Sequence, residues 1–287
     1  MSGALWAAAS GIGFGLFQSV NRRAVLDIED NYVSTFVQLV IAAVVLVAAT
    51  LVTEDVGRLA DAPAWSLVAF AAAGVVHFLI GWTFLNVSQR RIGATRTSPL
   101  LTTAPVFGLV LAFVLIDETP SALALAAIVP MMGGAYLVAG GGQEARGRDA
   151  LPGLACAFMW GLSPILTVEA LDGLDSPLLG VTLGMLASVA AYAVFLAGRR
   201  RPVRIASSAL AFKLTAGMLV ALGTWWRWLA LDGTSVGAVL ALALISVPVV
   251  LFLSPLLVGR HLERVTPRVW AGSLLVVAGS LALIAVE

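Results

Sequence analysis

Four ionisable residues interrupt or border the long apolar runs of this sequence: His77, Arg96, Glu169 and Arg227. A charged or titratable group at membrane depth costs several kcal/mol unless it is paired or faces water. Such residues are therefore candidates for binding a polar ligand or carrying a proton. Glu169 lies near two further acids, which favours a solvated position at a helix end.

Arg227 lies within the cluster Trp225-Trp226-Arg227-Trp228. A guanidinium group binds a carboxylate or phosphate through two parallel hydrogen bonds, and indole rings supply stacking and cation–π contacts. Arg227 and Trp226 are therefore predicted to bind an anionic group. The alternative is that Arg227 extends to a membrane interface where the tryptophans form an ordinary aromatic belt.

His77 lies near the middle of an apolar run over 64–86. It is a candidate for proton coupling because imidazole titrates near neutral pH, although a neutral, hydrogen-bonded packing role is the alternative. Trp82 and Asn86, four residues apart, share one helix face and are predicted to contribute an apolar wall and a polar contact. His77 lies about 140° from Trp82 around that helix, so one cavity need not include all three.

A polar stripe precedes the apolar run that ends at 116. Its members at helical spacing are Thr95, Ser98 and Thr102, with Arg96 and Thr103 beside them. Pro99 and Pro105 each remove a backbone donor and leave one carbonyl free. Hydroxyls and free carbonyls beside a water-filled cavity would suit a small polar molecule. Alternatively, the hydroxyls bond back onto their own helix and the prolines only bend it.

Composition excludes a soluble globular protein. Hydrophobic residues make up 60% of the chain and charged residues 11%, whereas soluble domains have about 45–50% apolar residues. The apolar runs approach the ~20 residues that a helix needs to cross a bilayer, and the ten-residue alternation of an outer-membrane barrel is not seen. The predicted class is an all-α integral membrane protein.

Apolar runs bounded by polar turns predict ten transmembrane helices. They cover 3–21, 31–52, 64–86, 94–116, 121–140, 150–169, 176–197, 207–230, 235–258 and 266–286. A glycine-rich polar segment over 140–148 separates the fifth from the sixth. The single cysteine, Cys156, lies within an apolar run and is expected to be a small core residue.

The chain contains an internal repeat. Glu118 and Gly134 match Glu263 and Gly279 at an offset of 145 residues, and Phe14-Gly15-Leu16 matches Trp160-Gly161-Leu162 at 146. Residues 1–141 and 149–287 are thus predicted to be two five-helix repeats. Because five is odd, the second repeat must cross the membrane in the opposite sense. Such inverted repeats place a substrate site between the halves, near the middle of the membrane.

The basic residues are unevenly distributed. Of the 17 Lys and Arg residues, 15 fall in or near the loops after spans 1, 3, 5, 7 and 9, and acids dominate the other side. The 15 are Arg22, Arg23, Arg90, Arg91, Arg96, Arg146, Arg148, Arg199, Arg200, Arg201, Arg204, Lys213, Arg260, Arg264 and Arg268. Because short basic loops stay in the cytoplasm, both termini are predicted to lie outside the cytoplasmic membrane.

Pro105-Val106-Phe107, the turn Asp117-Glu118-Thr119-Pro120-Ser121 and the Phe14-Gly15 and Trp160-Gly161 pairs resemble the EamA-type drug/metabolite transporter (DMT) superfamily. The resemblance covers essentially the whole chain. It implies a transporter with a central cavity lined mainly by spans 3, 4, 8 and 9, with 1 and 6 nearby. The chain departs from that family in having Gln38 where an arginine is frequent, and in a charge bias that places the termini outside rather than inside.

Neither a phosphate-binding GxxxxGK[ST] loop nor a His-Glu-x-x-His motif occurs in the sequence. We therefore expect no enzyme activity, cofactor or catalytic metal, and energy from a gradient or exchange. The predicted function is a secondary transporter moving a small polar or anionic organic metabolite by alternating access. The alternative is a flippase or scramblase for an amphipathic lipid-linked substrate.

The predicted partners are the small-molecule substrate and the lipid bilayer, with no nucleic acid and with a homodimer left open. The predicted site has three kinds of residue. Polar contacts come from Arg227, Arg96, Asn86, Ser98 and Thr102, apolar walls from Trp82, Trp226 and Tyr136, and proton coupling from His77.

Overall fold

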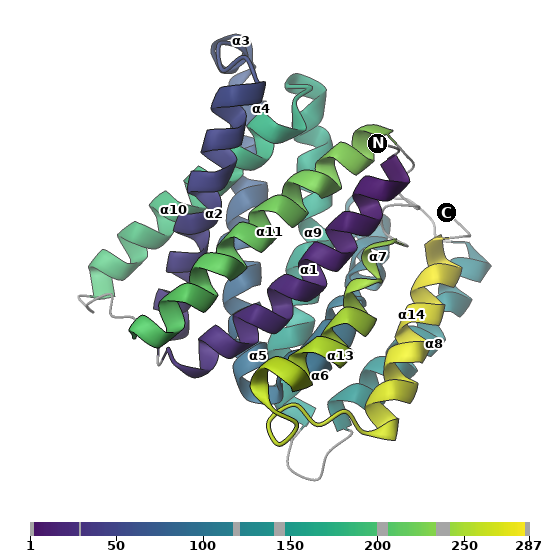
Figure 1. Ribbon diagram of the computed structural model, residues 1–287. Coiled ribbons are helices and arrows are strands. Elements are labelled where there is room, and N and C mark those ends of the chain that lie inside the picture. Colours follow the sequence, from purple (N-terminus) through teal and green to yellow (C-terminus); the bar gives the residue numbers. More distant parts are fainter. Residues whose placement is uncertain are drawn as a thin grey trace.

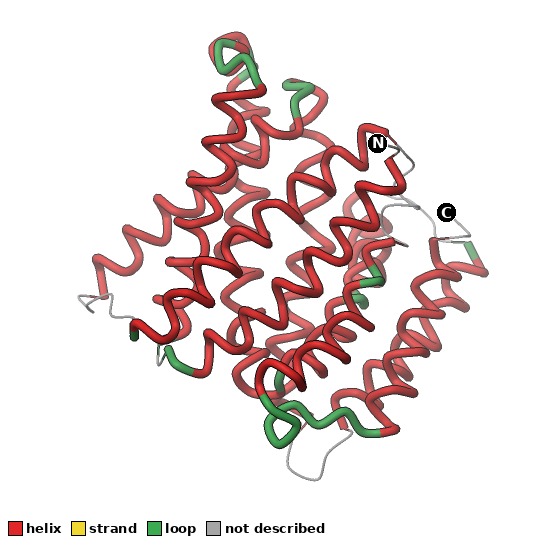
Figure 2. The backbone as a smooth tube through the Cα atoms, in the orientation of Figure 1, coloured by secondary structure: helices red, strands yellow, loops and turns green. Residues whose placement is uncertain are grey.

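The computed structural model describes residues 3–28, 30–116, 121–140, 147–199, 206–233 and 242–284, which form helices joined by loops, without strands (Figure 2). The first half contains α1 (Gly3–Leu26), α2 (Asn31–Thr53), α3 (Arg58–Asp61), α4 (Ala64–Gly74), the π-helix η1 (Val75–Gly81), α5 (Trp82–Ile92), α6 (Ala94–Leu101), α7 (Ala104–Ile116) and α8 (Ala122–Gly140). The second contains the 3₁₀ turn η2 (Gly147–Ala150), α9 (Leu151–Gly173), α10 (Pro177–Arg199), α11 (Ser207–Gly233), α13 (Ser246–Val258) and α14 (Pro267–Ile284).

Five helical stretches in the described part of the chain are long and apolar enough to cross a membrane, judged by length and composition. They are Asn31–Thr53, Ala64–Ile92, Arg148–Gly173, Pro177–Arg199 and Ser207–Arg227, and shorter apolar helices cover Leu125–Val138, Ser246–Val258 and Pro267–Ala282. The all-helical class is thereby confirmed. The number of ten crossings and the inverted repeat stay predictions, and the turn at 117–120 lies outside the described residues.

The bundle has two chemically different ends. The side of the bundle at which α1, α5, α8, α10 and α13 end is called the basic end. The side at which α1 begins and α14 ends is called the acidic end (Figure 1). At the basic end, Arg90 donates to the Ile28 carbonyl and Arg199 lies over the Tyr32 ring. At the acidic end, Arg58 donates to the Asp175 carbonyl. Contacts between the two halves therefore form at both ends.

Helices of opposite halves pack against one another. In Figure 1, α1 (purple) runs beside α11 (green), and α8 (teal) beside α14 (yellow). Further contacts join α2 to α10 and α11, α9 to α4 and α7, and α6 to α13. The two halves thus form one helical bundle rather than two separate ones.

Glycines allow two close contacts between the halves, that of α1 with α13 and that of α9 with α7. A Cβ atom on Gly15 of α1 would lie 2.6 Å from Val249 Cβ in α13, and one on Gly161 of α9 would lie 2.7 Å from the Ala104 carbonyl of α7. Such distances admit no side chain, so the backbones approach as small residues permit in membrane helices. The Phe/Trp-Gly pairs of the sequence repeat therefore have a packing role.

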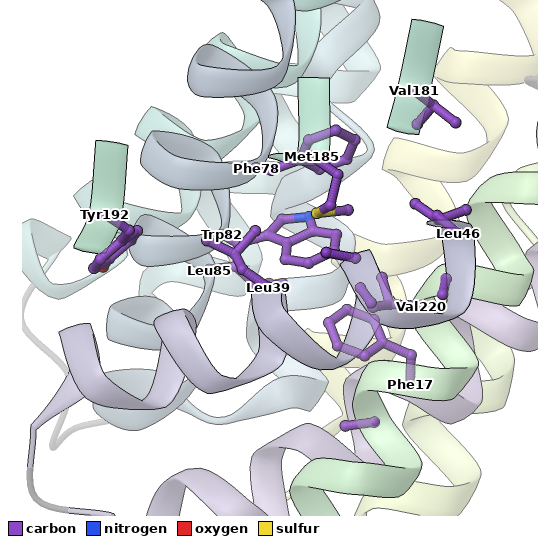
Figure 3. Packing of buried hydrophobic residues seen from close by; sticks show 14 of the residues in the cluster. Phe17, Leu39, Leu46, Phe78, Trp82, Leu85, Val181, Met185, Tyr192 and Val220 are labelled. Carbon is purple, nitrogen blue, oxygen red and sulfur yellow. The ribbon is translucent and has the colours of Figure 1, made fainter. Parts of the chain in front are cut away.

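The largest apolar core cluster joins α1, α2, η1, α5, α6, α9, α10 and α11 (Figure 3). Trp82 lies at its centre, fully buried, with its ring 6.1 Å from Phe17 and 5.2 Å from Phe78. Cys156 is buried in the same cluster, as expected for a small core residue.

Candidate functional site

A cavity of about 460 Å³ lies between the two halves. Its lining comes from α1, α4, η1, α6, α7, α9, α10, α11, α13 and α14. The cavity reaches Phe70, Leu171 and Gly180, which lie within two turns of the acidic end, and extends inward to Gln18 and Leu101. Residues at the basic end, such as Asn86 and Glu263, are not part of its lining. The cavity therefore extends from the bundle centre toward the acidic end.

Most of the cavity wall is apolar, and a few polar side chains interrupt it. These are Gln18, His77, Ser98, Thr102, Ser163, Thr167, Thr224, Arg227, Ser246 and Ser280. An apolar pocket with a small number of placed polar groups is the usual form of a small-molecule site. Four residues predicted from the sequence, Arg227, His77, Ser98 and Thr102, are brought together here.

His77 is held by two residues of α9. Its Nδ1 lies 2.7 Å from Ser163 Oγ, and its ring stacks on Trp160 with centroids 5.2 Å apart and planes 8° from parallel. His77 belongs to η1, where α4 widens into a π-helix before α5. Single-turn π-helical segments are rare and are frequent at functional sites. The imidazole is thus fixed in the cavity wall at a contact between the two halves.

Arg227 lines the same cavity from α11. Among the described residues it makes no hydrogen bond and no ion pair. Its neighbour Trp226 points elsewhere, with its ring 6.3 Å from Trp6 and close to Gly13 on α1. Arg227 therefore lines the cavity without a described partner, and Trp226 packs between α11 and α1.

The hydroxyls of the polar stripe divide between three arrangements. Thr102 and Thr103 donate back to carbonyls of their own helix, at Pro99 and Leu100, as the alternative interpretation required. Thr95 donates to Glu263 instead. Ser98 is buried, and its Oγ has no hydrogen-bond partner among the described residues. Ser98 is therefore the member of the stripe whose hydroxyl stays available to a ligand in the cavity.

Below the cavity, toward the basic end, four helices meet in a buried amide cluster. Asn21 Nδ2 donates to Asn86 Oδ1 and Gln89 Oε1, each at 2.7 Å, which leaves Asn21 Oδ1 to accept from Lys213 Nζ at 2.5 Å. Lys213 Nζ also donates to Gln38 Oε1 at 3.2 Å. Gln89 Nε2 donates to the carbonyl of Gln18, a residue of the cavity lining. The cluster thus closes the cavity floor and fixes each amide's orientation.

Lys213 was expected to be a loop cation, and that expectation was wrong. It is fully buried, two turns inside α11. Arg22, counted with the same loops, is only 5% exposed and is bonded to Glu263 through its Nε at 2.6 Å. Both cations stay inside because parts of the chain distant in sequence supply acceptors, which a count along the sequence does not detect.

Glu263 is likewise buried, at 1% exposure. Besides Arg22, its carboxylate accepts from the Ala94 and Thr95 backbone N–H groups and from Thr95 Oγ1, at 2.8–3.1 Å. These donors form the N-terminus of α6, where the helix dipole favours a negative charge. Glu263 follows α13, so this contact joins the second half of the chain to α1 and α6 of the first.

Five residues of the predicted site lie away from the cavity. Trp82 is in the apolar core and Asn86 in the amide cluster, where α5 carries them past the cavity floor. Trp226 packs on α1, and Arg96 is partly exposed in the first turn of α6. Tyr136 lies on the outer face of α8, 77% exposed. None of these five belongs to the cavity lining.

The structure adds residues that the sequence did not place in the site. Trp160 and Gln18 line the cavity and were not among the predicted site residues, although Trp160 begins a repeated aromatic-glycine pair. Ser163 and Thr224 gave no sequence signal. Within the described residues, no group of three or more His, Cys, Asp or Glu side chains could hold a metal ion.

The model of the EamA-like transporter family matches residues 1–140. This half of the chain belongs to the EamA-like transporter family. The match confirms the resemblance to the drug/metabolite transporters, whose members are membrane transporters rather than enzymes. With its apolar helices, this EamA-like protein is a multi-pass membrane protein.

Solved structures extend the likeness in fold to both halves. Seventeen chains match, among them one described only as "Crystal structure of protein". It covers 96% of each chain with a TM-score of 0.66 and 16% sequence identity, so the likeness concerns the fold alone. No curated protein matches the sequence.

Proposed function

We propose that this EamA-like protein is a secondary transporter that moves a small polar or anionic organic metabolite across the cytoplasmic membrane by alternating access. The substrate binds in the central cavity, between two inverted five-helix repeats at 1–141 and 149–287. The observation that carries the proposal is Arg227, a cation that faces an apolar cavity without a described partner. A guanidinium in such a setting gains most from an incoming carboxylate or phosphate.

Helix packing supports the inverted repeat. In the proposed repeat, α1 corresponds to α9, and α11 corresponds to the run of α4, η1 and α5. The contact of α1 with α11 then corresponds to the contact of α9 with α4, η1 and α5, and both contacts occur. The contact of α1 with α13 likewise becomes that of α9 with α7, and α2 with α11 becomes α10 with α4. The pairs α2–α10 and α8–α14 map onto themselves. A pseudo-two-fold axis relating the halves accounts for this pattern.

The closed basic end supports alternating access. The cavity extends toward the acidic end, whereas the amide cluster and the Glu263 contacts close the other. In transporters with inverted repeats, one half rocks against the other around a fixed central site. If the basic end is cytoplasmic, as the charge bias predicts, this conformation faces outward.

His77 is proposed to couple proton movement to substrate binding. Its ring lines the cavity that Arg227 also faces, and Ser163 holds it in place. An anion bound near Arg227 would favour the protonated imidazole, so substrate and proton would bind together.

The proposal can be tested with the purified protein. We would screen amino acids, organic acids, sugars and nucleotides by thermal shift, since a ligand of the folded state raises the melting temperature. Uptake of the best ligand would then be measured in proteoliposomes with and without a pH gradient.

For an anionic ligand, Arg227→Gln should weaken binding roughly tenfold or more, the expected loss for a charge-assisted hydrogen bond. Arg227→Lys should retain part of the affinity. Arg91→Gln, which alters an exposed arginine at the basic end, is the matched control and should bind normally. Equal affinities for R227Q and R91Q would remove Arg227 from the site.

A further inference from the structure

The Glu263 carboxylate occupies a complete anion site that other parts of the chain build. One oxygen accepts from Arg22 Nε at 2.6 Å and the Ala94 N–H at 3.1 Å, and the other from the Thr95 N–H and hydroxyl at 3.0 and 2.8 Å. All four donors belong to α1 and α6, in the first half. Glu263 enters from the segment between α13 and α14, in the second half.

Two further observations indicate that the site is built for a carboxylate. Arg22 is 5% exposed, and its buried Nη1 has no partner among the described residues, so the site holds one donor more than Glu263 uses. Gly93, just before α6, has a φ of +83°, and a Cβ there would lie 2.6 Å from Glu263 Oε1. A side chain at position 93 would therefore obstruct the site.

Opening the basic end must separate these partners. The donors and Glu263 come from opposite halves, and the halves move against each other in the mechanism proposed above. A departing Glu263 would leave a buried guanidinium unpaired, which is strongly unfavourable. Another anion that bound to the same donors would offset this cost.

We propose that the N-terminus of α6 and Arg22 form a second carboxylate-binding site, for which Glu263 is an internal, exchangeable occupant. During transport, the acid group of the anionic substrate takes the place of Glu263 as the basic end opens. This role in transport rests on the proposed function, whereas the site itself does not. The substrate would thus bind in succession to Arg227 in the cavity and to Arg22 at the basic end.

Chemical rescue tests the site without knowledge of the substrate. Glu263→Ala removes the internal carboxylate and leaves room for a small one. Sodium acetate should raise the melting temperature of purified E263A by roughly 2 °C or more. Acetamide at the same concentration and sodium chloride at the same ionic strength are the matched controls and should have smaller effects.

Two further proteins serve as comparisons. Acetate should raise the melting temperature of the wild type less than that of E263A, because the wild type's own carboxylate fills the site. The double variant R22M/E263A should lose the rescue. An acetate effect equal to that of chloride, or equal in all three proteins, would overturn the proposal.

If E263A cannot be purified, Glu263→Gln keeps the size of the side chain and gives a second measure. Gln offers one acceptor oxygen to four donors, so E263Q should melt below the wild type, and adding Arg22→Met should recover part of the loss. Additive effects of the two changes would overturn the site. The melting temperatures of E263A and E263Q do not depend on transport. Failure of the binding and uptake experiments would therefore count against the proposed function and would leave the test of the carboxylate site unchanged.

Discussion

Gly93 makes the Glu263 contact possible. Its φ of +83° is one that residues with a side chain rarely adopt, and a Cβ atom would collide with the Glu263 carboxylate. Gly93→Ala should therefore destabilise the protein by about 1–3 kcal/mol. Thermal unfolding in detergent measures the change.

The matched control is Gly198→Ala. Gly198 lies in α10 with no atom within 4 Å of an added Cβ, and its φ is not in the left-handed region. G198A should unfold at or slightly above the wild-type temperature, since alanine favours a helix over glycine. Equal losses in both variants would contradict the role given to Gly93.

Some of the buried charged residues could be predicted from the sequence and others could not. Arg227 and His77 could be found because each is an ionisable group inside an apolar run. Glu263 and Lys213 could not, because both lie close to loops in the sequence and owe their burial to other helices. One signal was available for Lys213: it is the single lysine among 17 basic residues.

At the scale of elements, hydropathy located the helices well but not their interruptions. The run over 94–116 is divided into α6 and α7 at Thr102 and Thr103, just before Pro105 removes a backbone donor. A bend at the prolines was the alternative interpretation of this run, and the helix is interrupted at Thr102 and Thr103, whereas Pro99 lies inside α6. The π-helix η1 could not be predicted, since its extra residue per turn leaves no mark in the apolar pattern.

The pairing of α8 with α14 gives a prediction at this scale. A Cβ atom on Gly134 would overlap the Gly272 carbonyl and lie 2.8 Å from the Val276 backbone nitrogen, both parts of the α14 backbone. Gly134→Ala must push the helices apart and should cost about 1–3 kcal/mol. Detergent unfolding would measure it.

Gly133→Ala serves as the control for this pair. The neighbouring glycine has no atom within 4 Å of an added Cβ. It should therefore have little effect or stabilise α8 slightly. Should G134A prove as stable as G133A, the close approach of α8 and α14 would be wrong.

At the scale of the whole molecule, the orientation in the membrane is open to direct measurement. Cysteines would replace Ala60, exposed at the acidic end, and Ser207, exposed at the basic end, with Cys156 changed to Ala. In intact cells, a membrane-impermeant maleimide should label A60C. It should label S207C only after permeabilisation, because basic loops stay in the cytoplasm.

The reverse labelling pattern would place the termini inside the cell, as the resemblance to the EamA-type transporters implies. It would also reverse the direction assigned to the cavity, which would then face the cytoplasm. The lining of the cavity and the two proposed anion sites, one in the cavity and one at the basic end, would be unaffected.

The amide cluster has no counterpart at the positions that the repeat relates to it. Because of this asymmetry, the outward-facing and inward-facing conformations should respond differently to temperature. At the repeat offset of 145, Gln38, Asn86 and Lys213 correspond to Leu183, Leu231 and Val68. If the halves exchange conformations, the layer that takes the place of the amide cluster at the acidic end would thus be mainly apolar, whereas the amide cluster itself is polar. Apolar contacts weaken on cooling. Cold should therefore favour the conformation described here, and warming should favour the opposite one.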